Sequence, residues 1–507
     1  MTRNQAYIVS ATLHPQGQEQ VRWTASPIVP MRSVNMAAYS STSMVIVDTV
    51  ADIPAVDVTQ YKTILCLGYH QTGDGSGGTF RYDPTSTMEA DQGLAFQPAF
   101  GPGRWLRVVE SAEPLSVKWW GAKGDNSRDD SDSIQAALNA ARRFDAVDDQ
   151  MNPPADPPPT HPGRKDLVTV HFPPGTYKVT KTLFINRGMR VTGARKNFSL
   201  ISFQDMPADA DGLRAWKYEL NGTGIVMERL QLRAGDLGTG AMLSIRGAHE
   251  SLIEDVTFYG KDGTSPSTAL RILNSQDITL SRLVFHRVGK LGAPVMTGAA
   301  LSIFKDVGAG SVAPNNIYLN DCRWENTTAT PIALKNCRGI YFQGGKIDQS
   351  FGSEVEDNAP GFYLEDATGT EVHRFFIGGI KGPVAHLIGY SNLLMADTRM
   401  GPGLYDAFFT GDPAYGDPSE SGFLPGRILT PQITLRNCTV DLSALNVTSR
   451  VASVFKIPLK DYRQYTGLAI AAVSYDPGTD TTRADVMTGP GWSSSVDSVR
   501  VRPRSYL

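Results

Sequence analysis

An eight-residue hydrophobic pattern recurs through the middle of the chain and limits its fold more than any other feature. The first, third, sixth and eighth positions of each copy are mostly apolar, and the third position is apolar in seven of eight copies. The copies begin at Ile225, Ser251, Ile278, Ile317, Ile340, Val372, Leu393 and Ile433. Their starts lie 26, 27, 39, 23, 32, 21 and 40 residues apart, so the shortest intervals match one coil of a solenoid and the longer ones carry insertions.

A second, weaker apolar run precedes several copies, for example at residues 269–273, 300–304 and 331–335. Two or three short strands per coil, stacked as parallel sheets, predict an all-β protein built as a parallel β-helix. Alternate residues of a strand point inward. We therefore expect an inner ladder at the third position, formed by Leu280, Leu319, Phe342 and Met395.

The overall charge and the cysteines exclude several classes of function. There are 48 Lys and Arg against 51 Asp and Glu, a net charge of -3, which argues against a nucleic-acid-binding or membrane-surface protein. The four cysteines lack zinc-site spacing, and Cys322 and Cys438 fall on the inward sixth position, so we expect free buried thiols. We expect no metal and no cofactor.

The ends of the chain differ from its middle. The sequence contains no apolar run of about 18 residues, the length that a membrane-spanning helix needs. The first residues also lack the basic-then-apolar order of a secretion signal. We expect an N-terminal arm or attachment segment at 1–44, a β-rich neck domain at 45–112, the β-helix at 113–445 and a C-terminal β cap for trimerisation at 446–507. Within the neck, two β-like runs flank a glycine-rich turn and predict a hairpin.

A dense acidic turn precedes one short amphipathic helix. Residues 129–132 offer N-cap and first-turn acceptors. The apolar face of the helix is formed by Ile134, Ala137, Leu138 and Ala141. This helix is expected to close the open end of the solenoid, which would otherwise expose core side chains and strand edges. A catalytic or calcium-binding role for Asp125, Asp129 and Asp130 is the less favoured alternative.

These segments resemble a known family. The sequences WWGAKGDNSRDDSDSIQAALNAA, VHFPPGTYKV and MRVTGAR resemble the entry motif of pectate-lyase-like, right-handed parallel β-helix proteins, and residues 67–87 with 103–108 are similar to the domain before that helix in bacteriophage tailspikes. The family usually has glycine and then threonine where this chain has Asn126 and Ser131. The resemblance implies a right-handed single-stranded β-helix, a homotrimer, and binding of host bacterial polysaccharide. It also implies that carboxylate pairs, in a groove on the helix wall or between subunits, cleave this polysaccharide.

Outward columns of the repeat supply the candidate catalytic residues. The residue after each copy includes His286, Glu325 and Asp348, so the two carboxylates are expected on consecutive coils about 4.8 Å apart. Paired carboxylates can divide into acid and base or nucleophile, as glycoside hydrolysis requires. Arg323 and Lys346 lie beside them and could hold an acidic sugar. A ladder of surface ion pairs is the more common explanation of such charges.

Other candidates lie in the insertions. Tyr405 and Phe409, in the aromatic segment at 401–427, could stack on sugar rings or pack against another subunit. Competing carboxylates are Glu354, Glu356, Asp357, Glu365, Asp366 and Glu371, and a further column holds Asp255, Asp321 and Asp397, where turn-capping is expected. His373 is expected to be a structural hydrogen-bonding residue.

Three functions remain open at this point. The favoured one is a phage tailspike that binds and depolymerises capsule, O-antigen or exopolysaccharide, by hydrolysis rather than elimination. The second is a non-enzymatic receptor-binding spike or structural adaptor, attached to other virion proteins through the N-terminal arm. The third, a secreted bacterial pectate-lyase-like enzyme, is disfavoured by the tailspike-like neck and the lack of a secretion signal.

Overall fold

The computed structural model describes residues 43–110, 113–142, 168–185, 188–216, 224–234, 240–260, 268–306, 312–349 and 359–401, followed by short strand segments between 407 and 502. The proposed arm therefore lies almost wholly outside the described residues, as does Tyr405. Within the described part of the chain, no helix has the length and apolarity needed to cross a membrane.

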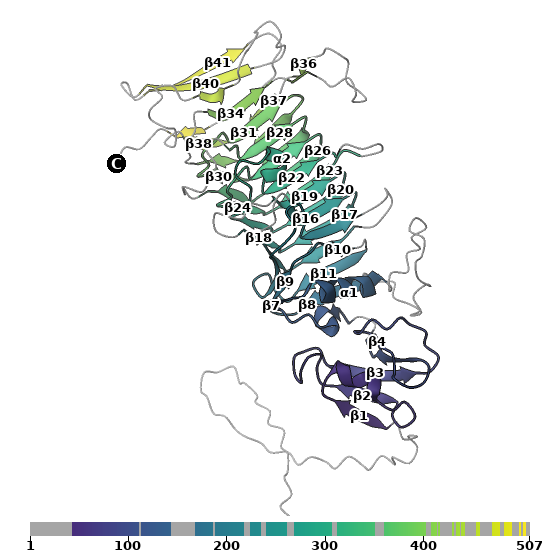
Figure 1. The fold of residues 1–507 in the computed structure, drawn as a ribbon. Coiled ribbons are helices and arrows are strands. Elements are labelled where there is room, and N and C mark those ends of the chain that lie inside the picture. The colour runs from purple at the N-terminus through teal and green to yellow at the C-terminus, as the bar shows by residue number, and fades with distance from the viewer. Residues whose placement is uncertain are drawn as a thin grey trace, which may run out of the picture.

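The N-terminal domain is a five-stranded sheet in the order β1-β2-β3-β5-β4 (Figure 1). Its strands are β1 (Met44–Val47), β2 (Thr63–Cys66), β3 (Gly78–Asp83), β4 (Ala95–Phe96) and β5 (Arg104–Arg107), with the 3-10 helix η2 (Val50–Ala55) after β1. The expected hairpin is confirmed by the antiparallel pairing of β2 and β3. Asp74 orders the glycine-rich turn between them, because its carboxylate accepts the backbone N–H groups of Tyr69, His70 and Ser76.

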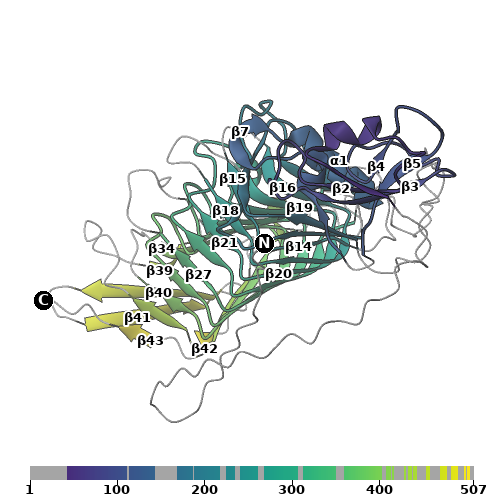
Figure 2. The same cartoon turned by 90° about the horizontal axis from the view of Figure 1, so that it is seen from below.

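The rest of the chain winds into a β-helix of three parallel sheets (Figures 1 and 2). Sheet 1 contains β6 (Leu115–Ser116), β8 (Val168–Phe172), β11 (Met189–Gly193), β14 (Val226–Glu228), β17 (His249–Glu254), β20 (Gln276–Ser281), β23 (Asn315–Asn320), β26 (Arg338–Gln343), β29 (Thr368–His373), β32 (Asn392–Ala396), β37 (Gln432–Arg436) and β42 (Val496–Asp497). Sheet 2 contains β7 (Asp125–Asp129), β9 (Gly175–Val179), β12 (Ser199–Phe203), β15 (Gln231–Ala234), β18 (Thr257–Tyr259), β21 (Val284–His286), β24 (Arg323–Glu325), β27 (Lys346–Asp348), β30 (Phe376–Gly378), β33 (Arg399–Met400), β38 (Thr439–Asp441) and β43 (Arg500–Arg502).

Sheet 3 closes each coil. It contains β10 (Leu183–Ile185), β13 (Leu213–Trp216), β16 (Ala241–Arg246), β19 (Thr268–Leu273), β22 (Leu301–Phe304), β25 (Ile332–Lys335), β28 (Phe362–Glu365), β31 (Ala385–Ile388), β34 (Ala407–Asp412) and β39 (Ser453–Lys456). The weaker apolar run of the repeat is the strand of this sheet. The short helix α2 (Val295–Gly298) precedes β22. The predicted all-β parallel β-helix is thus confirmed.

The inner ladder forms as the repeat predicts, with one copy misplaced. Leu280 pairs with Leu319, and Leu319 pairs with Phe342. Phe342 pairs with Val372, which pairs with Met395, so Val372 occupies the third position and not the first. The copy therefore begins at Thr370, two residues earlier than predicted. The intervals on either side of it change accordingly.

The fifth position of the repeat is the corner between sheets 1 and 2. Asp255, Asp321 and Asp397 have φ of 51°, 52° and 51°, in the left-handed region that aspartate and asparagine tolerate better than most residues. These aspartates are therefore turn residues, as expected. Asn126 also has a left-handed φ, of 62°, so asparagine can serve where the family has glycine.

Aromatic side chains stack along the core behind sheet 2. The rings of Phe258 and Phe285 are 5.1 Å apart and those of Phe285 and Trp324 are 5.0 Å apart, with interplanar angles of 8° and 5°. All three side chains are fully buried. This stack runs beneath β18, β21 and β24, the last of which carries Glu325.

The predicted capping helix is confirmed as α1 (Ser131–Arg142), which follows η3 (Val117–Trp120). The four residues of its predicted apolar face are all buried. Asp130 is buried, and its carboxylate accepts the N–H groups of Lys123 and Gly124 at 2.7 and 3.0 Å. Asp129 accepts hydrogen bonds from Ser131 and from the Thr180 hydroxyl. The acidic turn thus ties the helix to the first coil.

Three strands of the C-terminal segment extend the three sheets of the β-helix. β39, β42 and β43 pair in parallel with β34, β37 and β38, one strand in each sheet. An antiparallel hairpin of β40 (Ala469–Asp476) and β41 (Thr481–Thr488) lies between them in the sequence. A smaller hairpin of β35 (Ala414–Tyr415) and β36 (Ile428–Leu429) leaves the wall after β34.

Arg107 joins the N-terminal domain to the β-helix. Its guanidinium, 7% exposed as a residue, donates to the carbonyls of Gly93, Gly77 and Ser76 at 2.9, 2.9 and 3.1 Å. It also lies 4.6 Å from the ring centroids of Phe80 and of Trp119 in η3. Burial lowers the pKa of Arg107 to about 10.

We expect Arg107→Met to destabilise this junction by about 3 kcal/mol or more, because three buried carbonyls lose their donor. Differential scanning calorimetry should show the loss in the transition of the N-terminal domain. Arg81→Met, on an exposed residue of the same sheet, is the control and should change the stability little. An unchanged transition for Arg107→Met would contradict the proposed role of this side chain.

Candidate functional site

The candidate carboxylates lie side by side on the outer surface of sheet 2. Glu325 of β24 is the register partner of Asp348 of β27, as the repeat predicts. His286 of β21 is the partner of Glu325 on the preceding coil, with Nδ1 4.0 Å from Oε2. The side chains of Glu325 and Asp348 are 31% and 47% exposed, so both are open to solvent.

Lys346 lies between the two carboxylates. Its Nζ is 3.3 Å from Glu325 Oε1 and 3.0 Å from Asp348 Oδ2. The hydrogen bond to Asp348 and the contact with Glu325 raise the pKa of Lys346, so the lysine is charged at neutral pH. The lysine thus bridges the two carboxylates on the outer surface of sheet 2.

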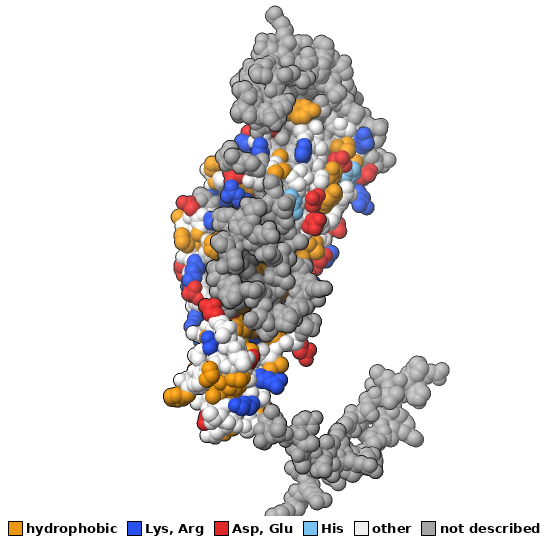
Figure 3. All heavy atoms as spheres, turned by 90° about the vertical axis from the view of Figure 1, so that its right-hand side faces the viewer, with side chains coloured by type: hydrophobic (Ala, Val, Ile, Leu, Met, Phe, Trp, Pro, Cys, Tyr) orange, Lys and Arg blue, Asp and Glu red, His pale blue; other side chains and the backbone are white. Residues whose placement is uncertain are grey.

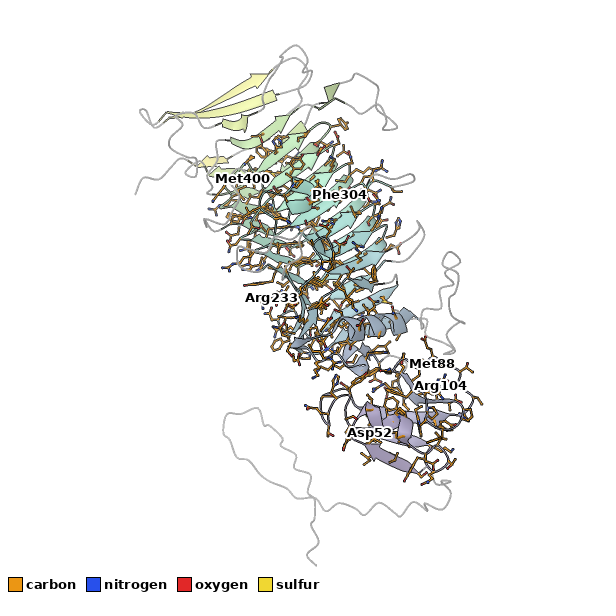
Figure 4. All side chains as sticks on the ribbon, in the orientation of Figure 1. Asp52, Met88, Arg104, Arg233, Phe304 and Met400 are labelled. Carbon is orange, nitrogen blue, oxygen red and sulfur yellow. The ribbon has the colours of Figure 1, made fainter. Side chains whose placement is uncertain are left out.

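Aromatic rings flank the carboxylates on the preceding coils. The Tyr259 ring stacks on the His286 ring at 5.1 Å with an interplanar angle of 26°, and the Arg233 guanidinium lies 5.7 Å from the Tyr259 centroid. These residues follow one another in register from β15 to β21. Figure 4 shows Arg233 and Met400 on the same side of the β-helix, the side formed by sheet 2.

Phe376 and Arg399 flank the carboxylates on the following coils. Phe376 of β30 is the register partner of Lys346, and Gly378 is the partner of Asp348. A Cβ on Gly378 would meet the Phe376 ring at 2.7 Å, so this ring covers the glycine beside Asp348. The Arg399 guanidinium lies 6.0 Å from the ring centroid of Phe376. The carboxylates thus occupy the middle of a row with aromatic rings and cations at both ends.

We call this row the carboxylate strip. It consists of Arg233, Tyr259, His286, Glu325, Lys346, Asp348, Phe376 and Arg399. Phe376 and Arg399 were absent from the predicted site. The misplaced copy at Val372 put Ile380 next to Asp348 in the column, and the correct start at Thr370 puts Phe376 beside Lys346. Arg399 lies in the copy at Leu393, whose start is correct, so its position did not depend on this error.

The other predicted site residues lie outside the carboxylate strip. Arg323 is exposed beside Lys346 and makes no ion pair within the described part of the chain. Phe409 is fully buried in β34, where it pairs with Ala385. Its predicted role in stacking on sugars is wrong, because the aromatic segment contributes a core strand of sheet 3. Tyr405 lies outside the described residues.

The competing carboxylates lie elsewhere. Glu354, Glu356 and Asp357 fall outside the described residues. Glu365, on sheet 3, pairs with Lys335 at 2.8 Å and accepts a hydrogen bond from the Tyr363 hydroxyl at 3.0 Å. Burial raises the pKa of its neighbour Asp366, whose carboxylate accepts the N–H of Tyr390 at a corner of the coil.

Glu371 and His373 form a pair on sheet 1, with His373 Nε2 3.0 Å from Glu371 Oε2. This pair lies on a different face from the carboxylate strip and brings together only two side chains that could bind a metal. Across the described ranges, no group of three or more His, Cys, Asp or Glu side chains is placed to hold a metal ion.

Two family models match the chain on either side of residue 112. Residues 46–110 match the model for a phage tail protein small four-stranded beta-sheet domain. Residues 115–324 match the model for rhamnogalacturonase A/epimerase, pectate lyase-like proteins, and this range includes most of β24. The chain has the domain make-up of a phage tailspike. The tailspike resemblance is thereby confirmed, and the phage tail domain supports a place in the virion tail.

Solved tailspikes share this fold at low sequence identity. Tailspike protein 4 of bacteriophage CBA120, represented by its enzymatically active domain, has a TM-score of 0.54 at 12% identity, covering 86% of this chain and 55% of that chain. The tailspike of Acinetobacter phage vB_ApiP_P1 has a TM-score of 0.54 at 13% identity, covering 82% and 70%. The gp42 tailspike of Acinetobacter phage vb_AbaP_AS12 has a TM-score of 0.52 at 12% identity, covering 90% and 78%. This tailspike-like chain therefore spans about half of the first of these structures.

Proposed function

We propose that the protein is a tailspike that binds bacterial surface polysaccharide and cleaves it at the carboxylate strip, by hydrolysis. The observation that carries this proposal is the register pairing of Glu325 with Asp348 in the middle of a solvent-open row that has aromatic rings on both sides. Strand spacing puts the backbones of the two residues about 5 Å apart, so their carboxyl groups can adopt the separation of about 5–5.5 Å that retaining glycosidases use. Aromatic rings supply contact area to sugars on either side of the cleaved bond.

The contacts of Lys346 with the two carboxylates would change when a charged substrate binds. A negatively charged sugar attracts the ammonium group away from the two carboxylates. Glu325 and Asp348 then face each other without the cation, as a carboxyl pair that can divide into an acid and a base or nucleophile. Glu325, the less exposed of the two at 31%, is the better general acid, and Asp348 is the nucleophile or base.

The proposal extends to the assembly. We propose a homotrimer, as the tailspike resemblance implies, with the N-terminal arm attached to other virion tail proteins. The host polysaccharide is the partner of the β-helix wall. Neither nucleic acid nor membrane insertion is part of this function, in keeping with the net charge of -3.

A binding-only spike is the second candidate. The observation that favours it is the position of Lys346, which neutralises both carboxylates and would make the strip a stable recognition surface. Purified protein incubated with polysaccharide from the host strain separates the two functions. Release of reducing ends without an unsaturated sugar product supports hydrolysis, an unsaturated product indicates elimination, and tight binding without products supports the binding-only spike.

Lys346→Met tests the chemistry further. Without the ammonium group, Glu325 and Asp348 repel each other permanently, so we expect the pH–activity profile of hydrolysis to shift upward by about one pH unit. Lys335→Met, which removes the partner of Glu365 on sheet 3, is the matched control and should leave the profile unchanged. Loss of all activity at every pH would instead mean that Lys346 neutralises a sugar carboxylate during elimination.

A further inference from the structure

An exposed aromatic step lies on sheet 1, away from the carboxylate strip. Tyr318 of β23 and Tyr341 of β26 are register partners, and their rings stack at 5.1 Å with an interplanar angle of 16°. Tyr318 is 42% exposed. In this stack Tyr341 covers one face of the Tyr318 ring, and Glu371 is the register partner of Tyr341 on the following coil.

The free face of Tyr318 points along the β-helix toward the preceding coil. Its register partner there is Thr279 of β20, whose side chain is much shorter than a tyrosine. The preceding residue in the same column is Leu252 of β17. The Tyr318 ring therefore projects further from the sheet than the side chain of Thr279 beside it. A flat ligand lying on Thr279 would contact the free face of the ring, and we call this feature the Tyr318 step.

Hydrogen-bonding groups lie beside this step. The second outward column of sheet 1 carries Ser281, Asn320, Gln343 and His373 on consecutive coils. Asn316 donates from Nδ2 to Asp277 Oδ1 at 3.0 Å at the edge of β23. The side chains next to Tyr318 in the second column are therefore neutral and polar, whereas the charged Glu371 lies on the far side of Tyr341.

Figure 3 faces the side of the molecule that sheet 1 forms in Figure 1, and the described surface there mixes polar, charged and hydrophobic side chains. Tyr318 is the only large hydrophobic residue exposed on the described strands of sheet 1. A stable subunit interface requires about 1,000 Å² with an apolar centre. One exposed ring among polar groups fits a sugar better than a second copy of the chain.

We propose that the Tyr318 step is a binding subsite for an uncharged pyranose ring of the polysaccharide, separate from the carboxylate strip. The inference rests on the proposed function, because it concerns the same polysaccharide. The apolar face of the sugar packs on the free face of Tyr318 above Thr279, and Ser281 and Asn320 bond its hydroxyl groups. This subsite holds the chain without taking part in its cleavage.

The test measures binding apart from cleavage. Titration calorimetry with intact host polysaccharide compares Tyr318→Ala, Tyr318→Phe and the control Tyr390→Ala, which removes a tyrosine exposed to 44% outside sheet 1, all in the Glu325→Gln background. We expect Tyr318→Ala to weaken binding by about 3- to 10-fold. Tyr318→Phe and Tyr390→Ala should bind like the parent. In the cleaving protein, Tyr318→Ala should raise KM and leave kcat unchanged.

Three outcomes would overturn the inference. Equal binding by Tyr318→Ala and the parent removes the subsite but leaves the cleavage proposal intact. A changed oligomeric state of Tyr318→Ala in light scattering assigns the ring to a subunit interface. No binding and no cleavage of host polysaccharide by the wild type overturns both the subsite and the proposed function.

Discussion

Glu325→Gln and Asp348→Asn are each expected to reduce the rate of polysaccharide cleavage by about 10²- to 10⁴-fold, because each removes one member of the acid–base pair. Both substitutions keep the shape of the side chain. They remove the charge that Lys346 contacts at 3.3 and 3.0 Å, and these contacts are solvent-exposed and contribute little to stability. The measurement is the release of reducing ends from host polysaccharide at matched protein concentrations.

Glu365→Gln is the matched control for these variants. It also removes a carboxylate paired with a lysine, 2.8 Å away, but on sheet 3. Its activity should equal that of the wild type. If Glu325→Gln and Asp348→Asn also cleave at the wild-type rate, then the carboxylate strip is not the catalytic centre.

Trp324→Ala should have the largest effect on stability, a loss of about 3–5 kcal/mol. Trp324 is fully buried, stacks on Phe285 at 5.0 Å, and lies 6.2 and 6.1 Å from the rings of Phe342 and Phe375. Removing the ring leaves a cavity between consecutive coils. Thermal or denaturant unfolding of the variant, compared with the wild type under the same conditions, measures the loss.

Trp324→Phe separates packing from hydrogen bonding. The indole Nε1 is buried and has no hydrogen-bond partner among the described residues, so phenylalanine removes no hydrogen bond. We expect Trp324→Phe to cost much less than Trp324→Ala. Equal losses for the two variants would show that the indole contributes something other than ring packing.

The repeat predicted much of the fold because stacking imposes one simple rule on the sequence. Inward positions are apolar on most coils, so the spacing of the repeat alone assigns Leu319 and Phe342 to one ladder. The same rule explains the error at Val372. The correct first position of that copy is Thr370, a buried polar residue. Because the pattern requires an apolar first residue, the copy was assigned to Val372 instead.

Other errors have physical causes as well. Phe409 lies in a stretch rich in turn residues, yet it forms a core strand because the sheet 3 partner Ala385 leaves room for its ring. The predicted repeat ends with the copy at Ile433, since the hairpin β40–β41 separates β39 from β42 and hides the interval of the next coil. Long insertions defeat a search that depends on spacing.

For the candidate site, the sequence predicted which residues are neighbours on consecutive coils, but not the contacts between their side chains. Register placed Glu325 next to Asp348, since backbone pairing alone decides which residues are neighbours. The position of Lys346 between them depends on side-chain rotamers, which the sequence does not specify. Phe376 could enter the column only with the corrected register, and the stacking of Tyr259 on His286 again depends on rotamers.

The most direct test of the carboxylate strip is a crystal structure of Glu325→Gln with a bound oligosaccharide from the host polysaccharide. The account predicts that the glycosidic oxygen of one linkage lies between residues 325 and 348, with sugar rings against Tyr259 on one side and Phe376 on the other. An oligosaccharide bound in another groove, with no atom in contact with Asp348, would contradict it.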